Sequence, residues 1–400
     1  MPSVCCYFQV HQPPRHRHFT FFDIDKGVAY EDEETNMQIL KKVAEKCYLP
    51  ANRIMLELIR EYKKEFRIAF SITGVVLEQM QKINPDVLDS FKRLADTGCV
   101  EFLNETYYHS LASVYSIREF REQVELHKIR IRELFGQNPK TFRNTELVYN
   151  NDLARTVEKM RYKAILAEGA DHVLGWRSPN HVYQPLGCKK IKLLLKNYRL
   201  SDDIAFRFSN RQWPEYPLTA EKYAHWIHQM NNGDVINLFI DYETFGEHQW
   251  KDTGIFDFLR AFPGEVLKHP DFRFQTPIEV VTENEPVAQL DIPNYISWAD
   301  MERDLTAWIG NPMQTDAISV LYGMEKQVRR KKNAGVLDIW RRLQTSDHFY
   351  YMCTKWFADG DVHKYFNPYQ SPYDAYINYM NILADFDHTL KGKGLYHGSR

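Results

Sequence analysis

The sequence has almost no excess charge of either sign. Its 400 residues include 51 lysines and arginines against 53 aspartates and glutamates, a net charge of −2 with histidine neutral. No basic field is available to hold a polyphosphate backbone, so we expect no nucleic-acid partner. Hydrophobic residues make up 44% and charged residues 26% of the chain, which is typical of a folded protein with a sizeable core.

Long hydrophobic runs are also missing. No stretch approaches the roughly 18 apolar residues that suggest a membrane span, so we expect no membrane partner. The start, MPSVCCYFQVHQPP, lacks the basic segment and apolar run of a signal peptide. The six cysteines form no CxxC pair, and buried reduced thiols are their simplest interpretation. These features predict a cytoplasmic protein; a secreted chain that has lost its leader is the alternative.

Short apolar runs alternate with longer amphipathic stretches up to about residue 285. We expect strands at 4–10, 67–72, 100–103, 141–144, 164–167, 191–195 and 235–240. The clearest helix, 116–135, has apolar residues at helical spacing and Gly136 as its stop. Seven strand–helix units predict an α/β fold, a closed or nearly closed seven-fold (β/α) barrel over residues 1–290. Three apolar stripes near 318–328, 336–343 and 375–390 then predict a helical C-terminal region, 291–400, packed on the barrel.

Polar side chains gather where these expected strands end. His11 and Gln12 follow the first strand, Glu146 follows the fourth, and Asp241 and Glu243 follow the seventh. The carboxyl ends of parallel strands meet at one rim, so these groups should converge there. Side by side, Asp241 and Glu243 cannot both ionise cheaply, and one should keep a proton near neutrality, as a general acid must. The alternative is that these acidic residues only complement the start of a helix.

Glu146 stands in the segment TFRNTELVYNN, directly after Arg143 and Asn144. Positive charge and hydrogen-bond donors at these positions would keep Glu146 ionised, as a nucleophile requires. A capping residue for the next helix is the other interpretation. In HQPPRHRH, at 11–18, the histidines could bind a metal, but no Asp or Cys stands nearby. We therefore favour His11 and Gln12 as partners of sugar hydroxyls, with the remaining histidines in a solvated loop.

These segments together resemble glycoside hydrolase family 57. The resemblance rests on five motifs in the family's order, namely HQP at 11–13, GCVEF at 98–102 followed by His109, the segment around Glu146, DYETFG at 241–246 and WADMERDLTAWIGN at 298–311. The motifs cover most of the chain. Each is weak alone, and their order makes the resemblance specific.

The resemblance implies a distorted seven-fold β/α barrel and retaining cleavage or transfer of α-glucosidic bonds, chemistry that needs no metal or cofactor. It places the nucleophile on Glu146 and the acid/base on Asp241. The expected substrate-binding residues are His11, Gln12, Glu101, His109, Glu243, Trp250, Trp298, Asp304 and Trp308. The motif versions look most like compact α-amylase-type members, so the expected substrate is an α-glucan or maltooligosaccharide.

Other functions stay open at this point. A 4-α-glucanotransferase would use the same residues, with a sugar hydroxyl in place of water. A metal-dependent deacetylase or mannosidase would need His and Asp ligands at the strand ends. A noncatalytic glucan-binding protein would use the same rim without chemistry. For Trp250 and Trp308, a place in the core is the alternative to stacking on sugar.

Overall fold

The computed structural model describes residues 2–355, 363 and 367–392. All seven predicted strands are present, as β1 (Ser3–Val10), β2 (Ile68–Ile72), β3 (Val100–Phe102), β4 (Thr141–Arg143), β5 (Ala164–Glu168), β7 (Lys192–Lys196) and β8 (Val235–Asp241). They pair in parallel as β3-β2-β1-β8 and as β7-β5-β4. The short strands β6 (Tyr183–Pro185) and β10 (Ala288–Leu290) extend the second group beyond β7, and β9 (Arg273–Phe274) pairs with the start of β1.

Two seams complete the circuit of strands. Beside β3 and β4, the Asn104 N–H donates to the Thr141 carbonyl at 3.0 Å, and the Arg143 N–H donates to the Asn104 carbonyl at 2.9 Å. Beside β7 and β8, the Asn197 N–H donates to the Asn237 carbonyl at 2.9 Å. The order β1-β2-β3-β4-β5-β7-β8 confirms the predicted seven-fold (β/α) barrel, and its distortion lies at these two sparsely bonded seams.

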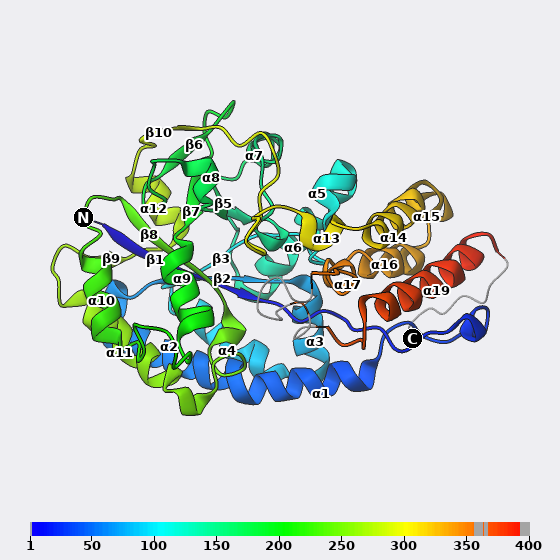
Figure 1. Cartoon of the computed structure of the whole chain (residues 1–400), viewed down its shortest axis with the longest axis horizontal. Coiled ribbons are helices and arrows are strands. Elements are labelled where there is room, and N and C mark those ends of the chain that lie inside the picture. The colour runs from blue at the N-terminus through cyan, green and yellow to red at the C-terminus, as the bar shows by residue number, and fades with distance from the viewer. Residues whose placement is uncertain (1, 356–362, 364–366, 393–400) are drawn as a thin grey trace.

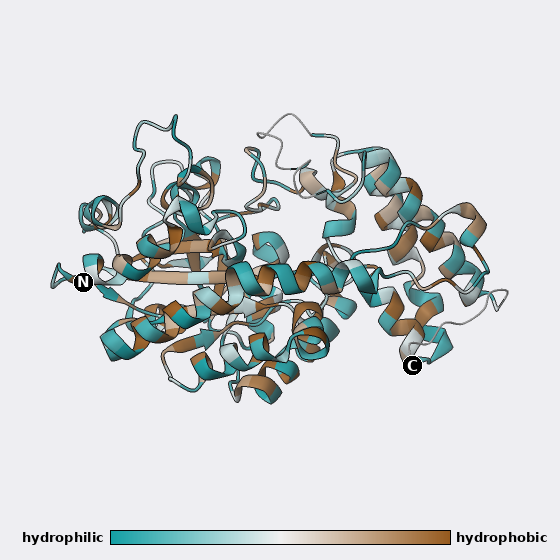
Figure 2. Cartoon of the chain, turned by 90° about the horizontal axis from the view of Figure 1, so that it is seen from below, coloured by the Kyte–Doolittle hydropathy of each residue, from teal (hydrophilic) through white to brown (hydrophobic). Residues whose placement is uncertain are grey.

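Helices surround the barrel (Figure 1). They are α1 (Glu33–Val43), α2 (Leu49–Tyr62), α3 (Gly74–Ile83), α4 (Pro85–Ala95), α5 (Ala112–Tyr115), α6 (Ile117–Phe135), α7 (Asn151–Lys159), α8 (Asp171–Leu174), α9 (Tyr198–Asp202), α10 (Ala220–His228), α11 (Ile255–Leu267) and α12 (Pro277–Glu283). The predicted helix at 116–135 is α6; the Ser116 side chain caps it, and left-handed Gly136 ends it. Figure 2 shows hydrophilic and hydrophobic colours alternating along these helices, as expected for amphipathic helices on a core.

After β10, the described residues contain no further strand. The helices there are α13 (Thr306–Ile309), α14 (Pro312–Gly323), α15 (Glu325–Lys331), α16 (Ala334–Arg342), α17 (Asp347–Tyr350) and α19 (Pro372–Leu390). They share a hydrophobic core around Ile318, Trp340 and Phe386, which Phe19, Leu111 and Val148 from the earlier part of the chain also join. This helical region lies at the end of the barrel toward which β1 points (Figure 1). A domain division at residue 290 stays a prediction, and residues 356–362, 364–366 and 393–400 of the predicted region lie outside the described part.

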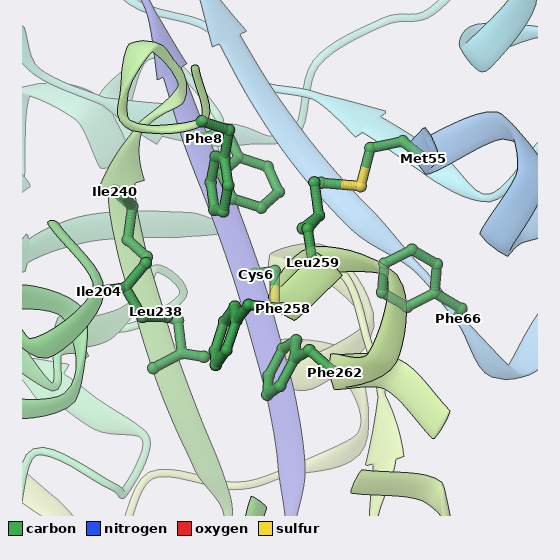
Figure 3. Close-up of a pocket in the computed structure, with 11 residues that line it drawn as sticks. Cys6, Phe8, Met55, Phe66, Ile204, Leu238, Ile240, Phe258, Leu259 and Phe262 are labelled. Atoms are coloured by element: carbon green, nitrogen blue, oxygen red, sulfur yellow. The ribbon is translucent and has the colours of Figure 1, made fainter. Parts of the chain in front are cut away.

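An apolar cavity of about 20 Å³ lies between the barrel wall and its outer helices. Figure 3 shows Cys6 and Phe8 of β1, Leu238 and Ile240 of β8, and Leu259 of α11 around it. The space suffices for about one water, and its lining gives a water no strong partner, so it is a packing gap and not a ligand site. All six cysteines are buried and unpaired, as predicted. Among the described residues no helix combines the length and apolar character needed to cross a membrane.

Candidate active site

The carboxyl ends of the barrel strands bring the predicted catalytic side chains to one rim. Asp241 is the last residue of β8 and pairs with Gln9 of β1. Glu146 lies just beyond β4, in the short helix Thr145–Leu147. His11 directly follows β1. The apolar runs that form the strands end in polar residues at this edge. The same sequence pattern therefore forms the barrel and places polar side chains at its rim.

Glu146 is held by two neighbouring side chains. The Trp298 indole Nε1 donates to Oε2 at 2.7 Å, and His109 Nε2 lies 3.0 Å from Oε1. The backbone of Glu146 is left-handed, with a φ of 56°. Burial acts to raise the pKa of Glu146, but the hydrogen bond and charge of His109 and the charge of Arg143 hold it below its usual value. Glu146 is thus a carboxylate, the form in which it can attack a carbon.

Asn144 does not take the part that the sequence suggested. Its amide donates to the Ser113 hydroxyl at 3.0 Å and to the Val148 carbonyl at 2.9 Å, and so ties the loop to itself. His109, which the sequence placed among the substrate-binding residues, is the nearby cation that contacts Glu146; its part in binding substrate stays a prediction. An asparagine amide after a strand can hydrogen-bond the backbone of its own loop as readily as a nearby side chain.

His109 is placed between two carboxylates, the buried Glu105 and the half-buried Glu146. Its Nδ1 lies 3.5 Å from Glu105 Oε2, on the side away from Glu146. Burial opposes its charge, yet hydrogen bonds to Glu105 and Glu146 raise the pKa of His109 to about 9. Burial likewise acts against charge on Glu105, but His109 and Arg143 lower the pKa of Glu105 to about 2. Ser71 adds a hydrogen bond to Glu105 at 2.5 Å. The imidazolium is therefore fixed in charge and orientation.

Asp241 has the opposite ionisation behaviour to Glu146. Burial, followed by the negative charge of Glu146, raises the pKa of Asp241 to about 6, although Arg143 and Lys196 oppose the rise. The sequence predicted that one of the two neighbouring acids, Asp241 or Glu243, keeps a proton. In the structure, burial and then the charge of Asp241 raise the pKa of Glu243 to about 8. The pair holds a proton near neutrality, as predicted.

Glu243 is anchored from two sides. Its Oε1 accepts hydrogen bonds from the Tyr48 hydroxyl and from the His11 backbone N–H, the latter at 3.2 Å. Tyr48 also hydrogen-bonds Gln12, which is buried beside it. The loop after β1 and the helical turn before α2 therefore hold Glu243 in place through its Oε1 atom.

The helical region contributes Asp347, a residue that the sequence did not single out. Asp347 Oδ2 lies 3.0 Å from His11 Nε2, and Thr73 Oγ1 lies 2.9 Å from His11 Nδ1. Burial and the charge of His109 lower the pKa of His11, so His11 is neutral. Burial opposes ionisation of Asp347, but His11, His109 and His348 hold its pKa far below the usual value. Nothing in the local sequence TSDHFY marks this aspartate, because its role depends on docking of α17 on the rim.

His11, His109 and Asp347 bring three side chains that can bind a metal ion close together, with their ligand atoms within 4.8 Å of one another. The two imidazole rings are stacked, with centroids 3.9 Å apart and planes tilted by 24°. A metal lies in the plane of each imidazole that binds it, at about 2.0–2.1 Å for zinc. Two planes so nearly parallel do not meet within a bond length of both rings. The cluster in this arrangement does not fit one metal ion.

The other two histidines of the segment 11–18, His16 and His18, have different environments. His18 is exposed, as expected for a solvated loop. His16 instead stacks on His348, with ring centroids 3.8 Å apart, so its placement in solvent was wrong. This part of the loop packs on the helical region, and the local sequence gives no sign of that contact.

Three residues implied by the family motifs make their described contacts with groups other than Glu146 and Asp241. Glu101 accepts a hydrogen bond from the Ile278 N–H at the start of α12 at 2.9 Å. Asp304 hydrogen-bonds Thr306 at the start of α13. Trp308 is 1% exposed, in the core of the helical region. Their part in sugar binding stays a prediction.

Trp250 has a different environment. Its side chain is 58% exposed in the loop after β8, and the Lys46 ammonium lies 5.1 Å from the ring centroid. The ring is free on the surface to contact a ligand, but no contact ties it to Asp241. Trp298, by contrast, lies directly on Glu146, and its backbone N–H also donates to the Glu146 carbonyl at 3.2 Å.

Comparison with known proteins gives a consistent result. The family model described as "Glycosyl hydrolase family 57" matches residues 5–293. A protein of Methanocaldococcus jannaschii named "Putative alpha-amylase" is 46% identical over 397 residues, which cover 96% of this chain and 84% of that protein. The fold is similar to a branching enzyme of Thermococcus kodakaraensis (TM-score 0.68, 15% identity, 97% of this chain and 90% of that one). It is also similar to a 4-alpha-glucanotransferase of Thermococcus litoralis (TM-score 0.66, 15% identity, 87% of this chain), of which this chain spans 56%.

Proposed function

Because the chain belongs to glycosyl hydrolase family 57, we propose that it is a retaining enzyme that cleaves α-1,4-glucosidic bonds in α-glucans or maltooligosaccharides. Glu146 is the nucleophile and Asp241 the acid/base. The observation that carries the proposal is the opposite ionisation of the two carboxyl groups at one rim, with the pKa of Glu146 lowered and that of Asp241 raised to about 6. The relative from Methanocaldococcus jannaschii supports the substrate class by its name.

The reaction proceeds in two displacements. Asp241 gives its proton to the glycosidic oxygen while the Glu146 carboxylate attacks the anomeric carbon, and the C–O bond to the leaving sugar breaks. Asp241 then takes a proton from water, which attacks the same carbon and releases Glu146. The two inversions retain the anomeric configuration.

The charges of the pair change in step with these roles. The negative charge of Glu146 contributes to the raised pKa of Asp241 in the free enzyme. That charge disappears when Glu146 becomes an ester, so the pKa of Asp241 falls and the group becomes a carboxylate base for the second step. The His109 imidazolium and the Trp298 N–H remain in place to receive Glu146 as its charge returns.

His11, Asp347 and Glu243 supply hydrogen-bonding groups for sugar hydroxyls beside the pair. Trp250 offers an exposed ring for a more distant sugar. A 4-α-glucanotransferase would use every one of these groups, with a sugar hydroxyl instead of water in the second step. The six buried, unpaired thiols suit a reducing compartment, and we include a cytoplasmic location in the proposal on that ground.

Product analysis on maltoheptaose tests the proposal. The wild type should release shorter maltooligosaccharides in the α configuration, and Glu146→Gln and Asp241→Asn should each lose at least about a thousandfold in kcat. Glu283→Gln, at the exposed end of α12, serves as a control for carboxylate loss. If both active-site variants keep wild-type turnover, the assignment is wrong. Products longer than the substrate identify transfer. A wild type without turnover of any α-glucan, despite binding it, identifies a binding protein.

A further inference from the structure

The segment between Trp298 and Asp304 joins the barrel to the helical region and carries the indole that contacts Glu146. Two of its residues, Asp300 and Arg303, have left-handed backbones with a φ of 54° each. This conformation is unfavourable for residues with a side chain and persists only where surrounding contacts hold it. Contacts with the rest of the molecule must therefore hold these two residues in place.

Asp300 is held by the helical region. Its Oδ2 lies 3.2 Å from the Lys355 ammonium, and its Oδ1 lies 2.8 Å from His363 Nε2. The Asp300 side chain is only 5% exposed, so both ion pairs are shielded from water and more favourable than pairs on the surface. Lys355 also donates to the Thr306 hydroxyl at 2.6 Å, which ties the pair to the start of α13.

Arg303 is held by the barrel. Its guanidinium lies 3.6 Å from Glu168 at the end of β5 and 3.4 Å from Asp202 at the end of α9. The same guanidinium donates to the Trp298 carbonyl at 2.6 Å. The Ser297 N–H donates to the Arg303 carbonyl at 3.0 Å. This bond closes the segment into a loop that begins at Trp298.

We propose that Asp300 and Arg303 are positioning residues for the nucleophile. Their ion pairs, one set to each part of the molecule, hold the strained segment so that the Trp298 indole fixes one oxygen of Glu146. The proposal rests on the assignment of Glu146 as the nucleophile. A carboxylate with a free rotamer would spend less time in line with the anomeric carbon, so loss of the segment's geometry should lower kcat and leave KM nearly unchanged.

Asp300→Asn is the sharpest variant. Asparagine has the same shape and tolerates the left-handed backbone, so the change removes the charge without adding strain. Glu302→Gln is its matched control, because Glu302 lies 3.1 Å from the same Lys355 but is half exposed and has ordinary backbone geometry. We expect kcat to fall about 10- to 100-fold in Asp300→Asn and less than about twofold in Glu302→Gln. Arg303→Gln tests the barrel side and should behave as Asp300→Asn does.

A double-mutant cycle with Trp298→Phe separates positioning from general structural support. Phenylalanine removes the indole N–H, so Asp300→Asn should have almost no further effect on kcat in the Trp298→Phe background. If the two losses multiply, or if Asp300→Asn and Arg303→Gln both keep kcat within twofold of wild type, the proposal is overturned. If Asp300→Asn does not fold, Arg303→Gln in the same cycle decides.

Glu146→Gly distinguishes failure of this proposal from failure of the catalytic assignment. Glycine accepts the left-handed backbone at position 146, so this variant removes the carboxylate without backbone strain. Azide should restore bond cleavage in Glu146→Gly and give a glycosyl azide of inverted configuration. Wild-type turnover by Glu146→Gly would sink the catalytic assignment and the positioning role with it. Azide rescue together with an unaffected Asp300→Asn overturns the positioning role alone.

Discussion

Replacing His109 with glutamine removes the positive charge between Glu105 and Glu146 and leaves a side chain that can still donate one hydrogen bond. A hydrogen bond to a charged group contributes about 1.5–3 kcal/mol, so we expect kcat/KM to fall about 10- to 100-fold at the optimum pH. Activity requires Glu146 ionised and Asp241 protonated. Because Glu146 must be ionised, activity is lost as pH falls through its pKa. The His109 charge helps to hold that pKa down against the effect of burial. Removal of the charge raises the pKa and moves the acid limb of the profile to higher pH.

The basic limb should move in the same direction. Burial and Glu146 set the raised pKa of Asp241, about 6, and His109 is among the charges that offset them. Without it the pKa of Asp241 rises, and activity survives to higher pH. The assay is kcat/KM on maltoheptaose between pH 3 and 9, alongside thermal melts. His228→Gln is the control, since His228 is half-buried but its ring nitrogen hydrogen-bonds the Val266 carbonyl at 2.9 Å instead. Limbs that stay fixed in His109→Gln while kcat/KM falls would refute an electrostatic role.

Three further variants test other parts of the account. Asp347→Asn removes the charge beside His11 and should lower kcat/KM about tenfold or more; it should also lower the melting temperature, because the depressed pKa of Asp347 means that its ionised form stabilises the fold; wild-type kinetics would remove Asp347 from the site. Leu259→Ala enlarges the apolar cavity and should lower the free energy of unfolding by about 2–5 kcal/mol in urea denaturation, with kcat unchanged; a negligible loss would mean that the cavity collapses. Trp308→Phe should lose stability and keep its KM, whereas a raised KM at full stability would place Trp308 in a sugar subsite.

The barrel was predictable because its strands are short apolar runs separated by amphipathic helices. Every one of the seven runs became a barrel strand. The pattern could not show how β3 meets β4, because that seam depends on Asn104, a polar residue just outside the strand. Nor could it show that the helical region docks on the rim, since apolar stripes say that a helix packs without saying against what.

The site was predictable where chemistry is local. Asp241 and Glu243 are close in sequence and do interact, although burial, and not Glu243, dominates the pKa of Asp241. Side chains that act across the fold left no local signal, as with Glu105 beneath His109 and Asp347 beside His11. Trp298 and Trp308 stand in one motif and look alike in sequence, yet one contacts Glu146 and the other fills a core. Only the path of the chain between them separates the two.

Trapping of the glycosyl-enzyme tests the central assignment most directly. Maltotriosyl fluoride has a leaving group that needs no proton, so Asp241→Asn should pass the first step and stall at the second, where the base is missing. Mass spectrometry of the quenched, digested protein should find one maltotriosyl group on the peptide that contains Glu146, and none in Glu146→Gln. An adduct on any other residue, or steady turnover by Asp241→Asn without an adduct, would contradict the account.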